Sequence, residues 1–353
     1  MKLLSLVTVA LHFAAVMILF GSLLMVVWLN VRGRAGRSSD LVSASFTLAK
    51  RLPVVMTYVI NLGVPPLLFL QVLYGRHVYS SSVLMAVPWF SIILLTMLDY
   101  WLLYRVVGAI EGGKPAWLPT LGAILVTVGI GQIYAMNMTL MLRPELWKDM
   151  YLANPAGLQG FSGDPTTTPR WLFILAGGPM LGGLWAALLS NMVYLSDGVR
   201  QVLRRTGGIS AFFGAVLQAF FALRVMNAQP DYVREQIGGS ALYNIATLAF
   251  VATIALAAVF GALQGFGKKT TTLLSTAGIL VGFLAIASAG VVRDGIRDFT
   301  LLKKGFNVYD AAVYANWSVL IAFLLLFVIM LGVIYWLLMV MRSATPPTEE
   351  VPL

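Results

Sequence analysis

The sequence predicts an all-α fold, a polytopic transmembrane bundle of about nine helices. Hydrophobic residues make up 59% of the 353 positions and charged residues 11%, whereas soluble domains average about 45–50% and about 25%. The apolar residues also form long continuous runs rather than an alternating pattern, which favours helices over a β-barrel. Helices suit a lipid environment because they pair every backbone polar group within the segment itself.

A membrane-spanning helix needs about 20 apolar residues, and runs of this length follow one another along the chain. The first run is too long for a signal peptide and lacks a small-residue cleavage pattern, so we expect it to remain as the first span. The predicted spans cover roughly 5–31, 52–75, 82–107, 117–142, 171–195, 208–227, 240–265, 271–292 and 313–341. Residues 1–342 therefore form the predicted transmembrane domain, and the polar segment 343–353 forms a flexible cytoplasmic tail.

Basic residues beside the spans predict the orientation, because loops on the cytoplasmic side carry an excess of Lys and Arg. The excess falls inside if the N-terminus is outside and the C-terminus inside, as in a multi-pass protein of a bacterial inner membrane. The longer connections 143–170, 228–239 and 293–312 then lie on the outer side. Since loops carry function more often than the scaffold does, we expect a partner protein on that side.

Missing residue types exclude several classes of site. The chain has no cysteine, which excludes disulfides, thiolate iron–sulfur ligation and covalent attachment of a c-type haem. Its formal net charge of +10 requires no nucleic-acid partner, because Lys and Arg beside the spans account for it. We find no convincing internal repeat, so an inverted-repeat transporter has no direct support.

The two histidines are the first candidate ligands. His12 lies in the outer half of the first span, where a histidine is costly and usually has a partner; a haem iron is one such partner. Gly21, nine residues later, permits the close approach of a helix or of a flat ring. The alternative for His12 is a hydrogen bond to a neighbouring carbonyl or hydroxyl group.

His77 lies at the outer mouth of the second span and is either a second axial ligand or a solvated loop histidine. A regular helix, rising about 1.5 Å per residue, would leave it nearer the surface than His12. Methionines compete for the same ligand position or simply pack in the core. The candidates are Met136, Met138, Met180 and Met226.

Pro65 and Pro66 predict a kink in the second span, because proline removes a helix hydrogen bond. The kink would either re-aim Gln71 and Arg76 towards a cofactor or only bend the bundle. In the third span, Asp99 is a costly acid in the inner half of the membrane. It would relay protons from the inner side, or form a structural pair with Arg105 or with Arg51.

Alternating charges surround the outer end of the eighth span and the loop before the seventh. They are Arg293, Asp294, Arg297, Asp298, Arg234 and Glu235. Oxidation of a quinol requires a proton acceptor beside the ring, and a carboxylate such as Glu235 or Asp294 can take that proton. The alternative is an ordinary solvated rim.

Two stretches resemble one known family. Leu11-His12-Phe13, followed by Val16 and Gly21, resembles the first helix of subunit I of cytochrome bd-type quinol oxidases. Gly63-Val64, then Gln71 and Tyr74-Gly75, resembles the second helix of that family, with Gln71 in the position of an acid. The resemblance covers roughly residues 10–105.

The resemblance implies that His12 is the axial ligand of a b-type haem near the outer face. Our first hypothesis is that the chain oxidises quinol there as a bd-like membrane subunit, and that electrons pass to another subunit of a respiratory complex, such as a periplasmic c-type cytochrome. Asp99, Glu235, Asp294 and Arg297 are the candidate catalytic residues, and Gly21, Gln71, Arg76 and His77 the further candidates for cofactor binding. The alternatives are a haem-free anchor or assembly subunit and, third, a transporter.

Overall fold

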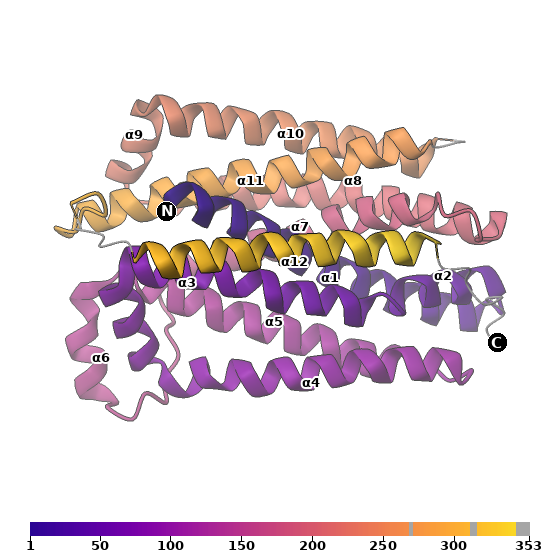
Figure 1. Ribbon diagram of the computed structural model, residues 1–353, viewed down its shortest axis with the longest axis horizontal. Helices are drawn as coiled ribbons and strands as arrows, with labels where there is room; N and C mark the ends of the chain where they lie inside the picture. The colour runs from indigo at the N-terminus through magenta and orange to yellow at the C-terminus, as the bar shows by residue number, and fades with distance from the viewer. Residues whose placement is uncertain (268–270, 311–315, 344–353) are drawn as a thin grey trace. The chain divides into compact units, whose positions relative to one another are not determined.

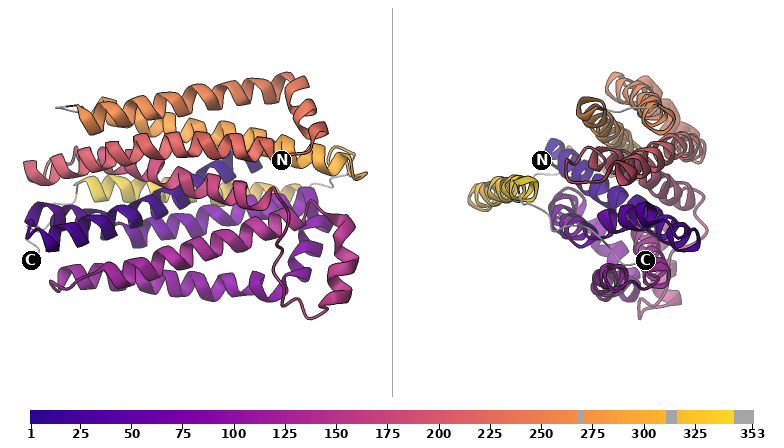
Figure 2. Two further views of the ribbon diagram at one scale, coloured as in Figure 1. Left: turned by 180° about the vertical axis from the view of Figure 1, so that it is seen from behind. Right: turned by 90° about the vertical axis from the view of Figure 1, so that its right-hand side faces the viewer.

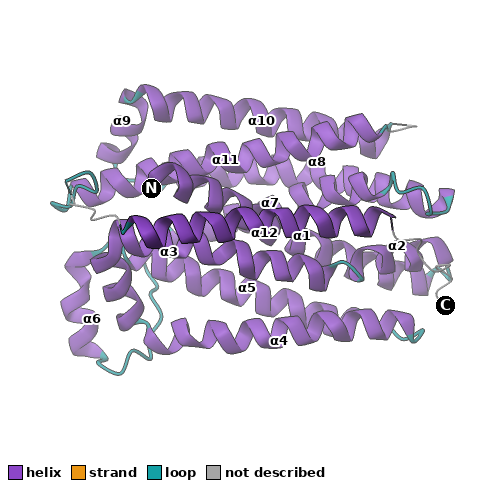
Figure 3. Cartoon of the chain, viewed as in Figure 1, coloured by secondary structure: helices purple, strands orange, loops and turns teal. Residues whose placement is uncertain are grey.

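The computed structural model describes residues 1–267, 271–310 and 316–343, and every regular element in these ranges is a helix (Figures 1 and 3). Nine helical segments in these ranges are long and apolar enough to cross a membrane. The predicted all-α fold is therefore confirmed, and the chain is a multi-pass membrane protein. The predicted tail lies outside the described residues, apart from Ser343 at the end of the last helix.

The chain divides into two compact units, of which the first, Met1–Val308, carries most of the helices. These are α1 (Lys2–Ala35), α2 (Ser39–Ala49), α3 (Leu52–Leu84), α4 (Ala86–Glu111), α5 (Trp117–Leu140), the 3₁₀ helix η1 (Pro144–Leu146), α6 (Trp147–Ala153), α7 (Thr167–Leu189), α8 (Asp197–Asn227), α9 (Asp231–Gly239), α10 (Ala241–Phe266) and α11 (Thr272–Leu302). The second unit begins at Tyr309 and contains the apolar helix α12 (Trp317–Ser343).

The long helices of the first unit run side by side as a bundle (Figures 1 and 2). The short helices α6 and α9 lie at the end of this bundle that holds the N-terminus (Figure 1). We name this end, where α1 begins and where α3 and α11 finish, the Lys2 end.

Several helices extend beyond the predicted spans. The second continues to Leu84 rather than to 75, the sixth begins at Asp197 rather than at 208, and the eighth ends at Leu302 rather than at 292. A count of apolar residues misses these extensions because they contain polar residues. The extensions are helical nonetheless, since their polar side chains form hydrogen bonds or ion pairs. The Ser196 hydroxyl, for example, caps α8 by accepting a hydrogen bond from the Val199 N–H at 3.3 Å.

The predicted kink in the second span occurs later than the prolines suggest. α3 runs through Pro65 and Pro66 and breaks at Tyr74, where φ is −131° and ψ is 28°. Gly75 follows immediately, and the Tyr74 hydroxyl is bonded to groups on other helices, so the break lies where a flexible residue adjoins an anchored one.

α7 packs against α1 and α8 at glycines. The backbones of Gly21 and Gly178 meet so closely that a Cβ on Gly21 would overlap the Gly178 carbonyl. A Cβ on Gly182 would lie 2.8 Å from the Gly21 Cα, and Gly183 faces Gly207 of α8 in the same manner. Small residues are what allow helices in lipid to approach at this distance.

Gly21→Val should therefore weaken the contact between α1 and α7. Overpacking of this kind costs about 1–3 kcal/mol, and here the obstructing atoms belong to backbone that cannot turn away. We expect a lower melting temperature of the detergent-solubilised protein than for the wild type. Gly290→Val in α11 is the matched control, because nothing lies within 4 Å of its added Cβ. Equal melting temperatures for the two variants would contradict this account.

Candidate functional site

His12 lies where α1 packs against α3. Its Nδ1 is 3.0 Å from the Val59 carbonyl oxygen, and a Cβ on Gly63 would lie 2.9 Å from its Cε1. Because a carbonyl oxygen can only accept, Nδ1 carries the ring proton and donates it, and Nε2 keeps its lone pair. Nε2 has no hydrogen-bond partner among the described residues.

This arrangement fits one axial ligand of a haem iron. Histidines that bind metals usually donate the other ring N–H to a carbonyl or carboxylate, which fixes the tautomer and the plane of the ring. No three His, Cys, Asp or Glu side chains in the described ranges group closely enough to hold a metal ion by themselves. A haem does not need such a group, because the porphyrin supplies four of the iron ligands and the protein only the axial ones.

His77 does not join His12. It lies 14 residues beyond Gly63 on α3, about 21 Å of helical rise, so the two rings cannot reach one iron. The expectation of a solvated loop histidine is also wrong, because the residue is only 6% exposed. Its ring centre lies 4.5 Å from that of Phe306 and 5.5 Å from that of Trp147, and its Nδ1 is buried without a partner.

The other predicted cofactor contacts are scattered. The space beside Gly21 is filled by α7, so the close approach that this glycine permits is that of a helix. Gln71 is partly buried on α3, and Arg76 is exposed. The break at Tyr74 therefore does not turn Arg76 into the bundle. Of the competing methionines, Met180 is fully buried in the core.

A cluster of paired charges holds the Lys2 end together; we name its members, Lys2, Tyr74, Asp294, Arg297 and Asp298, the Lys2 cluster. The Lys2 Nζ lies 2.7 Å from both the Tyr74 hydroxyl and Asp294 Oδ2, and also pairs with Asp298. The Tyr74 hydroxyl donates to Asp298, and Arg297 pairs with Asp294. The Arg297 guanidinium carbon lies 4.2 Å from the centre of the Tyr74 ring.

The solvated-rim alternative is thus wrong for the eighth span. Asp294 is 5% exposed and Arg297 8%, because α11 continues past them and α1 and α3 cover them. The solvated-rim alternative holds for the other two charged residues. Arg234 and Glu235 are exposed on α9, where Arg234 pairs with Asp231. The structure therefore places the predicted catalytic pair Asp294 and Arg297 in the interior, and Glu235 at the surface.

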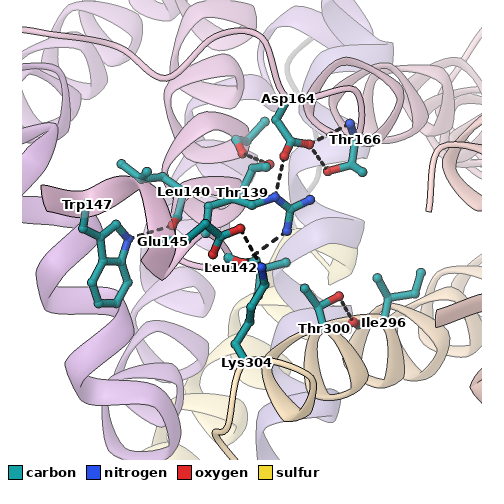
Figure 4. Close-up of polar contacts among 12 residues, drawn as sticks. Thr139, Leu140, Leu142, Glu145, Trp147, Asp164, Thr166, Ile296, Thr300 and Lys304 are labelled. Atoms are coloured by element: carbon teal, nitrogen blue, oxygen red, sulfur yellow. Dashed lines mark hydrogen bonds and ion pairs between the residues drawn. The ribbon is translucent and has the colours of Figure 1, made fainter. Parts of the chain in front are cut away.

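A second group of polar contacts surrounds Asp164 (Figure 4). Arg143 Nε donates to Asp164 Oδ2 at 2.7 Å, and Asp164 Oδ1 accepts from the backbone N–H and the hydroxyl of Thr166. Arg170, one turn into α7, and Arg293 of α11 lie close enough to Arg297 for their like charges to repel. The runs of apolar residues gave no reason to select Arg170 or Lys2 as site residues. Both lie near helix ends, where basic residues are common.

Asp99 is 1% exposed, on α4. Its Oδ2 accepts a hydrogen bond of 2.7 Å from the Thr127 hydroxyl of α5, and its Oδ1 is buried without a partner. The expected basic partners lie elsewhere: Arg51 bonds to Tyr194, and Arg105 covers the Trp101 ring. A shallow cavity of about 360 Å³ opens between α3 and α4 and is lined by Ile60, Thr96, Met97, Tyr100 and Trp101, without Asp99.

Comparison with known proteins gives one kind of match. No family model and no curated protein sequence matches this chain. Among solved structures, it is similar to a chain of the bd oxidase from Geobacillus thermodenitrificans, with a TM-score of 0.75 and 14% identity over 98% of both chains. The predicted resemblance to cytochrome bd oxidases is therefore confirmed for the fold, and this likeness of fold spans 98% of the chain.

Lys2→Met should destabilise the Lys2 end. Removing one partner of a buried ion pair costs about 3–5 kcal/mol, because the other charge stays buried. We expect a clear fall in melting temperature, partly recovered when Asp298→Asn removes the orphaned carboxylate as well. Lys304→Met is the matched control: it breaks the exposed pair with Glu145 (Figure 4), and exposed pairs contribute about 0–1 kcal/mol. A double variant no more stable than Lys2→Met would refute the pairing.

Proposed function

We propose that this chain is a bd-like membrane subunit of a bacterial respiratory complex, in which His12 is the axial ligand of one b-type haem. Quinol is oxidised near the Lys2 end, which we place at the outer face. Electrons leave to a partner subunit, such as a c-type cytochrome outside the membrane. The lipid bilayer is its environment, and no nucleic acid takes part.

One observation carries the proposal, namely the state of the His12 ring. The Val59 carbonyl holds the proton on Nδ1 and so presents the Nε2 lone pair. Gly63 leaves the ring room that any side chain would take. The bd-type fold adds support, because it places the first helix, with its Leu11-His12-Phe13 motif, in a bundle similar to that of a known bd oxidase.

The chain's own residues have separate tasks under this proposal. Val59 and Gly63 orient the imidazole, and the Lys2 cluster fixes α1, which carries it. Both oxygens of Asp294 already hold cations, whereas Glu235 is exposed, so Glu235 is the better placed acceptor for a quinol proton. Asp99, with one free oxygen, would relay protons from the inner side. A haem on His12 supplies one-electron transfer.

A haem-free anchor or assembly subunit is the second candidate. The hydrogen bond from His12 to the Val59 carbonyl favours it, because that bond also satisfies a histidine with a purely structural role. The two candidates differ in whether Nε2 binds iron.

The first test is a reduced-minus-oxidised spectrum of the protein purified with its natural partners. We expect a b-type α-band that disappears in His12→Ala, because the axial nitrogen is lost. His77→Ala is the control: it removes the only other imidazole, which packs between Phe306 and Trp147, and should keep the band. A wild-type spectrum without b-type haem would contradict the proposal and favour the haem-free anchor or assembly subunit.

A second test addresses the packing of the His12 imidazole against Gly63. Gly63→Val places a side chain against the His12 imidazole and should reduce the ratio of haem to protein severalfold, while leaving the chain inserted in the membrane. Gly75→Val on the same helix is the matched control, since nothing lies within 4 Å of its added Cβ. Haem content measured by pyridine haemochrome decides; equal content in both variants would mean that Gly63 does not position the ligand.

A further inference from the structure

The cavity between α3 and α4 is a groove on the side of a membrane-spanning helix. α4 packs chiefly on α5 and touches α3 much less, although α3 and α4 are adjacent in the chain. The cavity opens where the two helices part, and we name it the α3–α4 groove. Ile60 lines it from α3, and Thr96, Met97, Tyr100 and Trp101 line it from one face of α4.

The surface of the α3–α4 groove suits hydrocarbon. Met97 and Trp101 are 65% and 57% exposed on a membrane-spanning helix, so lipid rather than water faces them. The Tyr100 hydroxyl lies 3.1 Å from Thr57 Oγ1 and so has a partner of its own. In the hydrocarbon layer of a bilayer, acyl chains are the material that supplies dispersion contacts to such a surface.

Arg105 brings a positive charge to the edge of the groove. It lies one turn beyond Trp101 on α4, and its guanidinium carbon is 5.8 Å from the centre of the Trp101 ring. Within the part of the chain that the structure describes, Arg105 makes no ion pair. Basic residues near helix ends ordinarily extend towards the polar surface, whereas this side chain lies over a residue of the groove lining.

The depth of Arg105 matches the boundary between headgroups and hydrocarbon. α4 has 26 residues and is about 39 Å long, close to the thickness of a bilayer with its headgroups, about 40–45 Å. Arg105 precedes the end of α4 at Glu111 by about 9 Å of helical rise, and Met97 precedes it by about 21 Å. The headgroup layer takes roughly 5–8 Å on each side, so Met97 lies well inside the hydrocarbon.

We infer that the α3–α4 groove binds a phospholipid with an anionic headgroup, whose phosphate contacts Arg105 and one of whose acyl chains runs along Trp101 and Met97. The guanidinium fork matches the oxygens of a phosphate. A headgroup with net negative charge complements Arg105, whereas a zwitterionic one carries a cation of its own. In the proposed orientation the lipid belongs to the inner leaflet, whose anionic lipids attract basic residues. The inference does not depend on a haem.

Photolabelling tests the groove in a bilayer. The full-length protein is placed in phosphatidylcholine nanodiscs with a minor fraction of phosphatidylglycerol that carries a diazirine in one acyl chain, and mass spectrometry identifies the labelled peptides. We expect the peptide around Met97 to be labelled more than other lipid-facing helices. Phosphatidylglycerol should label it about fivefold more than the same probe with a phosphatidylcholine headgroup, because one basic residue at an anionic surface contributes about 1 kcal/mol.

Two variants separate the headgroup from the chain. Arg105→Gln should abolish the preference for phosphatidylglycerol, and Met97→Trp, which fills the groove, should reduce the label severalfold with either headgroup. The matched controls are Arg205→Gln, an exposed arginine on α8, and Leu248→Trp, which replaces a side chain on α10 that is 65% exposed. Both controls should leave the labelling of α4 unchanged.

Each other result would overturn the inference. Equal labelling of all lipid-facing helices would mean that only the ordinary lipid shell surrounds α4. Equal labelling by the two headgroups would contradict the role of Arg105. If a photoreactive long-tailed quinone labels α4 and phosphatidylglycerol does not, the groove holds a quinone instead. The His12-dependent spectrum is measured separately, so failure of this inference leaves the proposed function intact.

Discussion

The first unit depends on how closely α1 approaches its two neighbours. On one side, Gly21 meets the backbone of α7 at Gly178 and Gly182; on the other, the His12 ring fills the space that Gly63 leaves on α3. In lipid there is no water to drive helices together, so close packing and interhelical hydrogen bonds must hold the bundle. The glycines supply the first, and the bond from His12 to Val59 is one of the second.

The Lys2 cluster imposes the other constraint, which is electrostatic. Lys2 bridges Tyr74 of α3 to Asp294 and Asp298 of α11, and so joins three helices by a single side chain. Low polarity strengthens these pairs and equally penalises any member left alone.

The sequence predicted the fold class and the positions of the spans, because runs of apolar residues are a local property. It also singled out His12 as a candidate ligand, since a histidine in a span is conspicuous. Burial at the helix ends depends on which helices meet, and no local pattern reports that. Solvent exposure was one of the two alternatives predicted for His77 and for Asp294, and both residues are buried. Lys2 was not singled out at all. The helical extension of α11 to Leu302, which brings these charges inside, follows from tertiary pairing rather than hydropathy.

The helix α1 carries the Lys2 cluster contact, the His12 hydrogen bond and the Gly21 contact, and together these fix the position of His12 along the bundle. Lys2, His12 and Gly21 are spaced along α1 by ten and nine residues, about 15 Å and about 14 Å of rise. Shifting the sequence register of α1 by one residue would rotate each side chain by about 100° away from its partner. The Lys2 cluster, the Gly21 contact and the His12 hydrogen bond would then be lost together. The position of the imidazole is therefore set by contacts far above and below it.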